Sequence, residues 1–328
     1  MFNNWINIHD LSRLRDKVLH GEWRGVLKRA GKDDRARIRS TWEHTQGPPL
    51  NAWDIPLLRR RWNLLVSGDE EVGHVEYIGK KFLAGKKGLA AFSPCCGSGS
   101  NEVRWAGTGL FSRIDACDLS APRIAAARAA AEKGGLSGII GFSLSDWREA
   151  PMSAPYDLVI AEGALHHLYP MRSALARMHG MLKPGGLLLV NDFVGPSRFQ
   201  WTPGQLQAAN ALLALIPADY RRRWSDGRVK TSVDAPGRLR MKLADPSEAA
   251  ESSLILPLLG EMFDTLELKN KGGALIPLVF HGIAHHYIQP DETAAEILRL
   301  CFATEDLLMR SGGIAGDYIL GVFRKPAA

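Results

Sequence analysis

The sequence predicts an α/β fold in which helices cover both faces of a parallel sheet. From residue 88 onward, short apolar runs of strand length alternate with stretches of helical composition. Such alternation is typical of βαβ units, whose strands are buried on both sides. The composition agrees, because 328 residues with 45% hydrophobic and 23% charged side chains can form a large core.

The predicted elements follow one another in a regular order. Strands are expected at residues 88–94, 111–118, 138–144, 156–162, 185–192, 263–270 and 317–325. Helical composition fills residues 101–109, 120–135, 171–186 and 202–217. In an open sheet of this kind a ligand binds beyond the carboxyl ends of the strands. The residues that follow each strand are therefore the candidates for a site.

The segment before the first strand differs in charge from the rest. Residues 1–87 hold 17 Lys and Arg against 11 Asp and Glu, together with five of the nine tryptophans. We interpret this segment as a helical cap or lid on a main domain at 88–328, with helical insertions around the acceptor site at 193–262 and 272–313. A basic, aromatic segment also fits nucleic acid, although solvated helices often carry such charge.

Composition also bears on the cellular setting. No apolar run reaches the roughly 18 residues that a bilayer crossing needs, and the N-terminal residues are too polar for a secretory signal. Four cysteines make no disulfide framework in a chain of this size. We expect a cytoplasmic protein that does not bind membranes.

The stretch "FSPCCGSGSNE", residues 92–102, joins the first strand to the first helix. Gly97 and Gly99 allow a tight turn and close approach to a ligand. A nucleoside triphosphate is excluded because the loop has no Lys or Arg. A dinucleotide is disfavoured because Glu102 stands where its third glycine belongs, beside the pyrophosphate. S-adenosylmethionine, which carries a sulfonium and an ammonium, suits the loop best.

Acidic residues follow the next three strands. Asp118 ends the second strand, where a carboxylate can accept the ribose hydroxyls of a nucleoside. Asp146 and Trp147 end the third strand, where an acid and an aromatic ring can hold adenine. Glu162 ends the fourth. All four residues are expected at one edge of the sheet.

Taken in order, these stretches resemble the class I S-adenosylmethionine-dependent methyltransferases. The similarity spans residues 88–192 and includes "FSPCCGSGS", "DLS", "SDW", "YDLVIAEGALHHL" and "LKPGGLLLV". It implies a Rossmann-like doubly wound sheet of seven strands with an antiparallel last strand, and S-adenosylmethionine as co-substrate. The cofactor-binding residues that it implies are Ser93, Cys95, Gly97, Gly99, Glu102, Asp118, Leu119, Asp146, Trp147 and Glu162.

The first motif departs from the family pattern at two places. Ser93 replaces an acid, so Glu102 is the candidate to hold the cofactor's ammonium. Cys95 replaces a glycine, and its backbone can approach the ligand only if its φ is negative. We interpret the paired cysteines as small loop residues and predict neither a metal centre nor redox chemistry, because no further ligands lie nearby.

His166, His167 and Asp192 are the candidate catalytic residues. The histidines follow the fourth strand, where an acceptor would bind, and either can take a proton from a hydroxyl or amine. Each can equally pack under a helix or bond the backbone, with a packing role favoured slightly for His167. Asp192 ends the fifth strand and either orients the acceptor or caps a loop.

Two further polar groups lie late in the chain. In "VFHGIAHHY", His281 and His285 are expected on one helical face, with His286 beside them; a polar acceptor pocket fits better than a metal site, which lacks a third ligand. This helix and the N-terminal tryptophans are the expected roof of the site. The basic run at 221–230 is either a solvated face or an anion site.

The resulting functional hypothesis is methyl transfer to an O, N or C atom of a small-to-medium molecule, by in-line displacement in a lidded pocket. Two alternatives stay open: methylation of RNA or protein on the basic N-terminal segment, and a protein that uses the pocket without methylating. We expect no nucleic-acid partner and leave self-association open. Deletion of residues 1–60 is expected to spare cofactor binding and abolish turnover.

Overall fold

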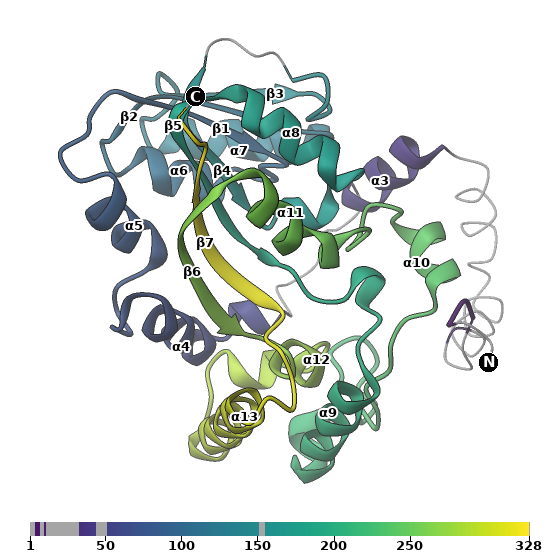
Figure 1. Ribbon diagram of the computed structural model, residues 1–328. Helices are drawn as coiled ribbons and strands as arrows, with labels where there is room; N and C mark the ends of the chain where they lie inside the picture. The colour runs from purple at the N-terminus through teal and green to yellow at the C-terminus, as the bar shows by residue number, and fades with distance from the viewer. Residues whose placement is uncertain (1–3, 7–9, 11–32, 44–50, 151–154, 328) are drawn as a thin grey trace.

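The computed structural model describes residues 4–6, 10, 33–43, 51–150 and 155–327 (Figure 1). Seven strands form one sheet in the order β3-β2-β1-β4-β5-β7-β6. The strands are β1 (Leu89–Pro94), β2 (Phe111–Asp118), β3 (Ile140–Leu144), β4 (Tyr156–Glu162), β5 (Leu182–Phe193), β6 (Asp264–Gly272) and β7 (Tyr318–Arg324). β7 lies antiparallel to both of its neighbours, β5 and β6. The seven-stranded fold with an antiparallel last strand is confirmed.

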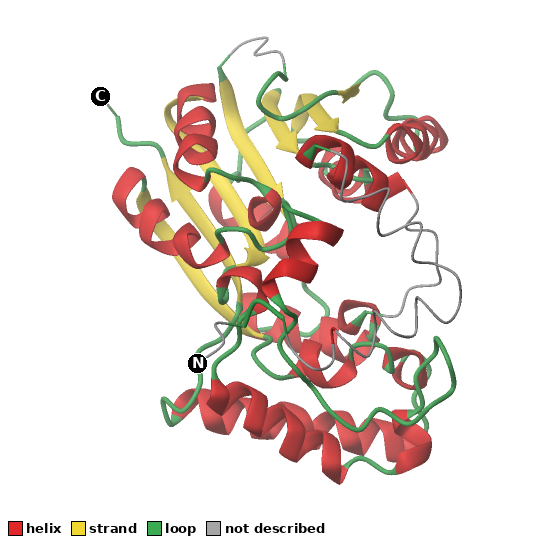
Figure 2. Cartoon of the chain, turned by 90° about the vertical axis from the view of Figure 1, so that its right-hand side faces the viewer, coloured by secondary structure: helices red, strands yellow, loops and turns green. Residues whose placement is uncertain are grey.

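Helices pack on both faces of this sheet, and further helices extend beyond one end of it (Figure 2). Those before β4 are α3 (Asp34–Glu43), α4 (Pro56–Ser67), α5 (His74–Phe82), α6 (Ser100–Ala106) and α7 (Ala121–Lys133). Those after β4 are α8 (Met171–Met181), α9 (Pro203–Leu215), α10 (Arg238–Ala244), α11 (Ile255–Met262), α12 (Ile276–Phe280) and α13 (Glu292–Arg310). Among the described residues, no helix combines the length and apolar composition that crossing a bilayer requires.

The alternation of side chains along the strands divides the core between the two faces. Val159 and Ala161 of β4 belong to a cluster with residues of α8 and α11. Leu158 and Ile160 belong to the opposite cluster, which α4 to α7 cover. This period of two decides which side chains at the strand ends can meet.

Part of the N-terminal segment belongs to the core of the sheet domain. Ile55 and Leu58 are fully buried in a third cluster, formed with α9, α12 and α13. Val66 and Ile78, of α4 and α5, are buried in the cluster on the sheet. Deletion of residues 1–60 would therefore expose apolar core, and it no longer tests the cap alone.

α3 takes a different position from α4 and α5. It contacts α7 and α10 (Figure 1). Thr41 of α3 donates to the carbonyl of Ala244 at 2.7 Å, which joins the N-terminal segment to the end of α10. α3 thereby lies next to the carboxyl ends of the strands.

Candidate functional site

The loop after β1 has the backbone that its glycines predict. Gly97 and Gly99 have φ values of +55° and +77°, which favour glycine. A Cβ on Gly99 would lie 2.8 Å from Ala127 and from the ring of Phe142, so a side chain does not fit there. The N–H of Gly97 donates to Asp118 at 2.9 Å, and the other carboxylate oxygen accepts from the N–H of Ser120 at 2.8 Å. Asp118 thus connects the end of β2 to the loop.

The condition set for Cys95 is not met. Its φ is +51°, a left-handed conformation that is rare for a residue with a side chain. The backbone of Cys95 therefore does not meet the requirement for approaching the cofactor. Burial raises the pKa of both loop thiols, Cys95 and Cys96, well above the usual value, so they stay protonated. This agrees with their interpretation as small, unreactive loop residues.

Glu102 reaches back from α6 to the residue that replaces the family's acid. Ser93 donates its hydroxyl proton to Glu102 Oε1 at 2.6 Å, and both side chains are buried. The other oxygen, Oε2, is buried without a hydrogen-bond partner among the described residues. Burial raises the pKa of Glu102 to about 7, although the bond from Ser93 opposes the shift. An unpaired carboxylate oxygen beside the loop suits an ammonium ligand.

A cavity of about 300 Å³ lies between α3 and the ends of β2 and β3. Leu119 and Asp146, two of the predicted cofactor residues, line it together with Arg35 and Arg39 of α3. Asp146 is buried and accepts from the backbone N–H and the guanidinium of Arg148, each at 2.9 Å. Arg35 Nε lies 3.2 Å from the same carboxylate. The cavity therefore occurs where the sequence predicts a nucleoside.

The ring of Trp147, which is expected to lie against adenine, is itself packed into the core. It is buried in the cluster that contains Phe92 and Cys117. The guanidinium of Arg148 lies 4.8 Å from the centre of the ring, which covers one face. The indole thus has a structural role of its own next to Asp146.

Asp192 fixes the segment that follows β4. Its Oδ2 accepts from the N–H groups of Ala164 and Leu165 at 2.9 and 2.6 Å, at the start of the short helix η2 (Leu165–His167). Its Oδ1 accepts from the N–H of Phe193 at 2.6 Å and contacts Nδ1 of His166. Asp192 is buried and caps the segment after β4, not the loop after β5 that the sequence suggests, and its carboxylate also orients His166.

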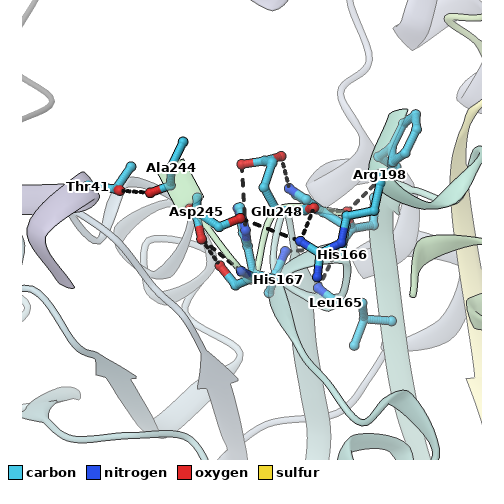
Figure 3. A network of polar contacts seen from close by, with 12 residues as sticks. Thr41, Leu165, His166, His167, Arg198, Ala244, Asp245 and Glu248 are labelled. Atoms are coloured by element: carbon cyan, nitrogen blue, oxygen red, sulfur yellow. Dashed lines mark hydrogen bonds and ion pairs between the residues drawn. The ribbon is translucent and has the colours of Figure 1, made fainter. Parts of the chain in front are cut away.

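His166, His167 and Glu248 converge at the end of β4, and we call these three residues the His–Glu cluster (Figure 3). Nε2 of His166 lies 3.8 Å from one oxygen of Glu248, and Nδ1 of His167 lies 3.9 Å from the other. Burial opposes charge on His166, but Asp192 outweighs it and raises the pKa of His166 to about 9. Burial and the neighbouring His166 lower the pKa of His167 well below its usual value.

Glu162 does not join this cluster, although it ends the strand that leads into the histidines. It pairs in register with Asn191, so it points to the opposite face of the sheet from Asp192. There it accepts hydrogen bonds from His74, Trp105 and Asn191 at 2.7, 2.6 and 3.1 Å. Burial opposes ionisation, but the neighbouring His74 and these hydrogen bonds lower the pKa of Glu162 to about 2. Because side chains alternate between the two faces of a strand, Glu162 and Asp192 lie on opposite faces although they lie at the ends of adjacent strands.

α3 covers the histidines with one of the N-terminal tryptophans. The ring of Trp42 meets that of His167 edge to face, with centroids 5.0 Å apart. The guanidinium of Arg123, from α7, lies 4.4 Å from the centre of the Trp42 ring. Of the other N-terminal tryptophans, Trp53 and Trp62 instead approach Tyr318 of β7, and Trp23 lies outside the described residues.

The expected helix at "VFHGIAHHY" is wrong. α12 ends at Phe280, Gly282 has a φ of +78°, and a separate short helix, η6 (Ala284–Tyr287), follows. His281 and His285 therefore share no helical face. His286 bonds the carbonyl of Arg222 at 3.0 Å instead, and Tyr287 is buried among residues of α9 and α13. The segment packs there and not on α3.

Lys230 explains part of the basic run at 221–230. Its ammonium donates to the carbonyls of Leu278, Val279 and His281 at 2.7, 2.9 and 3.0 Å. It thus closes the end of α12. Arg222 and Arg223 pair with Asp219 and Asp226 on the surface.

Several residues of the site have no signal in the sequence. Glu248 lies in a segment of irregular backbone, 81 residues after His167, and its carbonyl accepts from Arg198 at 3.3 Å. Arg198 itself has a φ of +57° and its N–H bonds the carbonyl of Ala249 at 2.6 Å. Such contacts arise from chain folding and not from spacing, so sequence patterns miss them.

Part of the chain is similar in sequence to known proteins. Residues 93–190 match the family model of a methyltransferase domain. An uncharacterised protein of Synechococcus sp. is 31% identical over 150 residues, which are 45% of this chain and 36% of that protein. A ubiquinone biosynthesis O-methyltransferase of Bradyrhizobium sp. is 31% identical over 117 residues, 36% of this chain and 41% of the relative.

The solved structures include two similar folds. The [4+2]-cyclase SpnF has a TM-score of 0.46 and 17% identity, with 77% of this chain and 81% of that chain covered. The N-methyltransferase NodS from Bradyrhizobium japonicum, in complex with S-adenosylhomocysteine, has a TM-score of 0.45 and 15% identity, with 90% and 100% covered.

Residues 93–190 carry a methyltransferase domain, with S-adenosylmethionine as the co-substrate of that domain. The residues at the ends of β1 to β3 fit this molecule, because Glu102 offers an unpaired buried oxygen and each oxygen of Asp118 keeps a lone pair for a ribose hydroxyl. The match spans only about a third of the length of the Synechococcus relative.

Proposed function

We propose that the protein transfers the methyl group of S-adenosylmethionine to an oxygen, nitrogen or carbon atom of a small-to-medium molecule. The observation that carries this proposal is the cavity of about 300 Å³ between α3 and the ends of β2 and β3. Its lining includes Leu119 and Asp146, two residues implied for the cofactor. α3 continues from this cavity to the histidines after β4, which supports a covered reaction site.

The chain's own residues divide the binding of the co-substrate among them. Asp118 accepts the ribose hydroxyls, Asp146 and Leu119 border the adenine, and Glu102 takes the ammonium. When bound, S-adenosylmethionine supplies a methyl group activated by positively charged sulfur. The loop around Gly97 and Gly99 lets the backbone approach it closely.

The acceptor binds at the ends of β4 and β5, next to the His–Glu cluster. Trp42 and α10 exclude water from that side. Alignment of the acceptor with the methyl group can lower the barrier by roughly 7–11 kcal/mol, so a proton acceptor assists without being essential.

The rival reading as an RNA methyltransferase has less support. Among the described residues of the N-terminal segment, Arg35, Arg60 and Lys81 each pair with an acidic residue. Arg61 pairs with Glu305 inside the protein. These four cations are therefore neutralised and offer little free charge to phosphates.

Calorimetry with S-adenosylhomocysteine, followed by methyl-transfer assays with a radiolabelled donor and a panel of small hydroxyl, amine and carbon acids, tests the proposal. We expect micromolar binding of S-adenosylhomocysteine, no binding of NAD, and label in a small product. Binding of NAD without S-adenosylhomocysteine would contradict it. Tight S-adenosylhomocysteine binding with substrate rearrangement and no label transfer would favour the non-methylating alternative.

A further inference from the structure

The rings of His166 and His167 lie against each other, with centroids 4.0 Å apart, and both face the carboxylate of Glu248. The ligand atoms of His166, His167 and Glu248 all lie within 4.8 Å of each other. The two separations between a histidine nitrogen and a carboxylate oxygen, 3.8 and 3.9 Å, exceed hydrogen-bond length. Figure 3 shows the two histidines and Glu248 gathered at this point.

The spacing and the donor types match those of a metal centre. Zinc binds histidine nitrogen and carboxylate oxygen at about 2.0–2.2 Å, which places two ligands of a tetrahedral site roughly 3.3–3.5 Å apart. The two histidine–carboxylate separations are a few tenths of an ångström wider, and all three ligand atoms lie within 4.8 Å of one another, so side-chain rotations are needed to bring them to bonding distance. Two imidazoles and one carboxylate also suit Fe²⁺ and Co²⁺.

The surroundings orient the histidine as metal sites do. Asp192 contacts Nδ1 of His166, which leaves Nε2 directed at Glu248. Three backbone N–H groups hold Asp192 in turn. A carboxylate behind a ligating histidine is the usual supporting arrangement in metal sites.

Glu248 is held from the other side. Arg198 donates to the carbonyls of Asp245 and Glu248 at 3.5 and 3.3 Å, which fixes the backbone and leaves the Glu248 carboxylate directed at the histidines. The exposed fractions of the three side chains are 16%, 14% and 25%, so the cluster is partly open. Three protein ligands with one open side are the pattern of catalytic and not of structural zinc sites.

We propose that His166, His167 and Glu248 bind one divalent transition-metal ion of the Zn²⁺ or Co²⁺ type, with Asp192 as the supporting carboxylate and an open position for an oxygen of the acceptor. The sequence predicts no metal centre, because two adjacent histidines and a distant glutamate have no recognisable spacing. The use of the open position rests on the proposed function, whereas binding of the ion does not.

For the test, the full chain is first treated with a chelator. It is then titrated with Co²⁺, with visible absorption as the readout, and separately with Zn²⁺, with calorimetry as the readout. We expect one ion per chain. Glu248→Gln should weaken binding more than tenfold, and Asp192→Asn by about 10- to 100-fold. Glu261→Gln is the matched control, because Glu261 pairs with Arg172 on the surface and should leave binding unchanged.

Melting temperatures of the variants and binding of S-adenosylhomocysteine to the same samples complete the experiment. A wild-type chain that binds no ion at one equivalent, or a folded Glu248→Gln variant that binds it as wild type does, would overturn the metal site. If S-adenosylhomocysteine still binds in that case, the proposed function survives. Ion binding without S-adenosylhomocysteine binding would sustain the metal site and contradict the proposed function.

Discussion

The two sides of the carboxyl edge are assembled from different distances along the chain. On the cofactor side, the loop after β1 is held by Asp118 and bordered by Asp146, all within one run of about 50 residues. On the acceptor side, His167 meets Trp42 from α3 and Glu248 from a segment after α10. The first side therefore comes from short motifs close together in the sequence, and the second from segments far apart in the chain.

The largest effect is expected on the binding of the cofactor. Asp118→Ala removes the acceptor of the Gly97 N–H and of the ribose hydroxyls, so S-adenosylhomocysteine should bind about 2–4 kcal/mol more weakly. That is roughly 30- to 1,000-fold in Kd by calorimetry. Asp118→Asn keeps the shape and serves as the comparison. Unchanged affinity in the alanine variant would refute the role given to β2.

Glu102→Gln sharpens the comparison through pH. Because the pKa of Glu102 is raised to about 7, the affinity of wild type for S-adenosylhomocysteine should fall as the pH drops from 8 to 6, by about tenfold. The glutamine variant should bind more weakly at pH 8 and lose this dependence. Parallel pH profiles of the two proteins would show that Glu102 does not hold the ammonium.

Glu102→Gln should also change the stability of the ligand-free protein. At pH 8 it should stabilise the fold, although it weakens ligand binding at that pH. As the pH rises from 4.5 to 7, the unfolded chain loses the Glu102 proton before the folded chain, because the folded pKa is the higher one, so wild type loses stability. Glu102→Gln should raise the free energy of unfolding at pH 8 by about 1–3 kcal/mol and change it little at pH 4. Urea unfolding at both pH values measures this.

Trp42→Ala breaks the acceptor side alone. Loss of the ring over His167 should admit water and reduce kcat/KM for the acceptor about tenfold, while S-adenosylhomocysteine affinity stays within a factor of about two. Trp53→Ala is the control, because Trp53 is exposed and approaches Tyr318 instead. If Trp42→Ala and Trp53→Ala lost turnover equally, α3 would have no specific role on the acceptor side.

The smallest effect is expected at His286, outside both sides. Its ring bonds the carbonyl of Arg222 in a partly exposed position. His286→Ala should therefore cost less than about 1 kcal/mol of unfolding free energy and leave cofactor binding and turnover unchanged. A loss of turnover in His286→Ala would show that the histidines at 281–286 belong to the site after all.

The sequence predicts the sheet well because each strand is a short apolar run between turn signals, and every predicted strand boundary lies within three residues of the observed one. It also identifies Asp118 and Leu119 at the strand ends. It does not separate Glu162 from Asp192, since the face of a strand end depends on pairing register with Asn191. It misses Glu248 and Arg35 altogether, because their partners lie far away in the sequence.

α3 touches both sides of the edge with residues seven positions apart, Arg35 at Asp146 and Trp42 at His167. A ligand that moves one end of a rigid helix of two turns moves the other end as well. If the co-substrate and the acceptor bind on these two sides as proposed, they are energetically linked, and linkage is reciprocal: the factor by which the co-substrate alters the affinity for the acceptor equals the factor by which the acceptor alters that for the co-substrate.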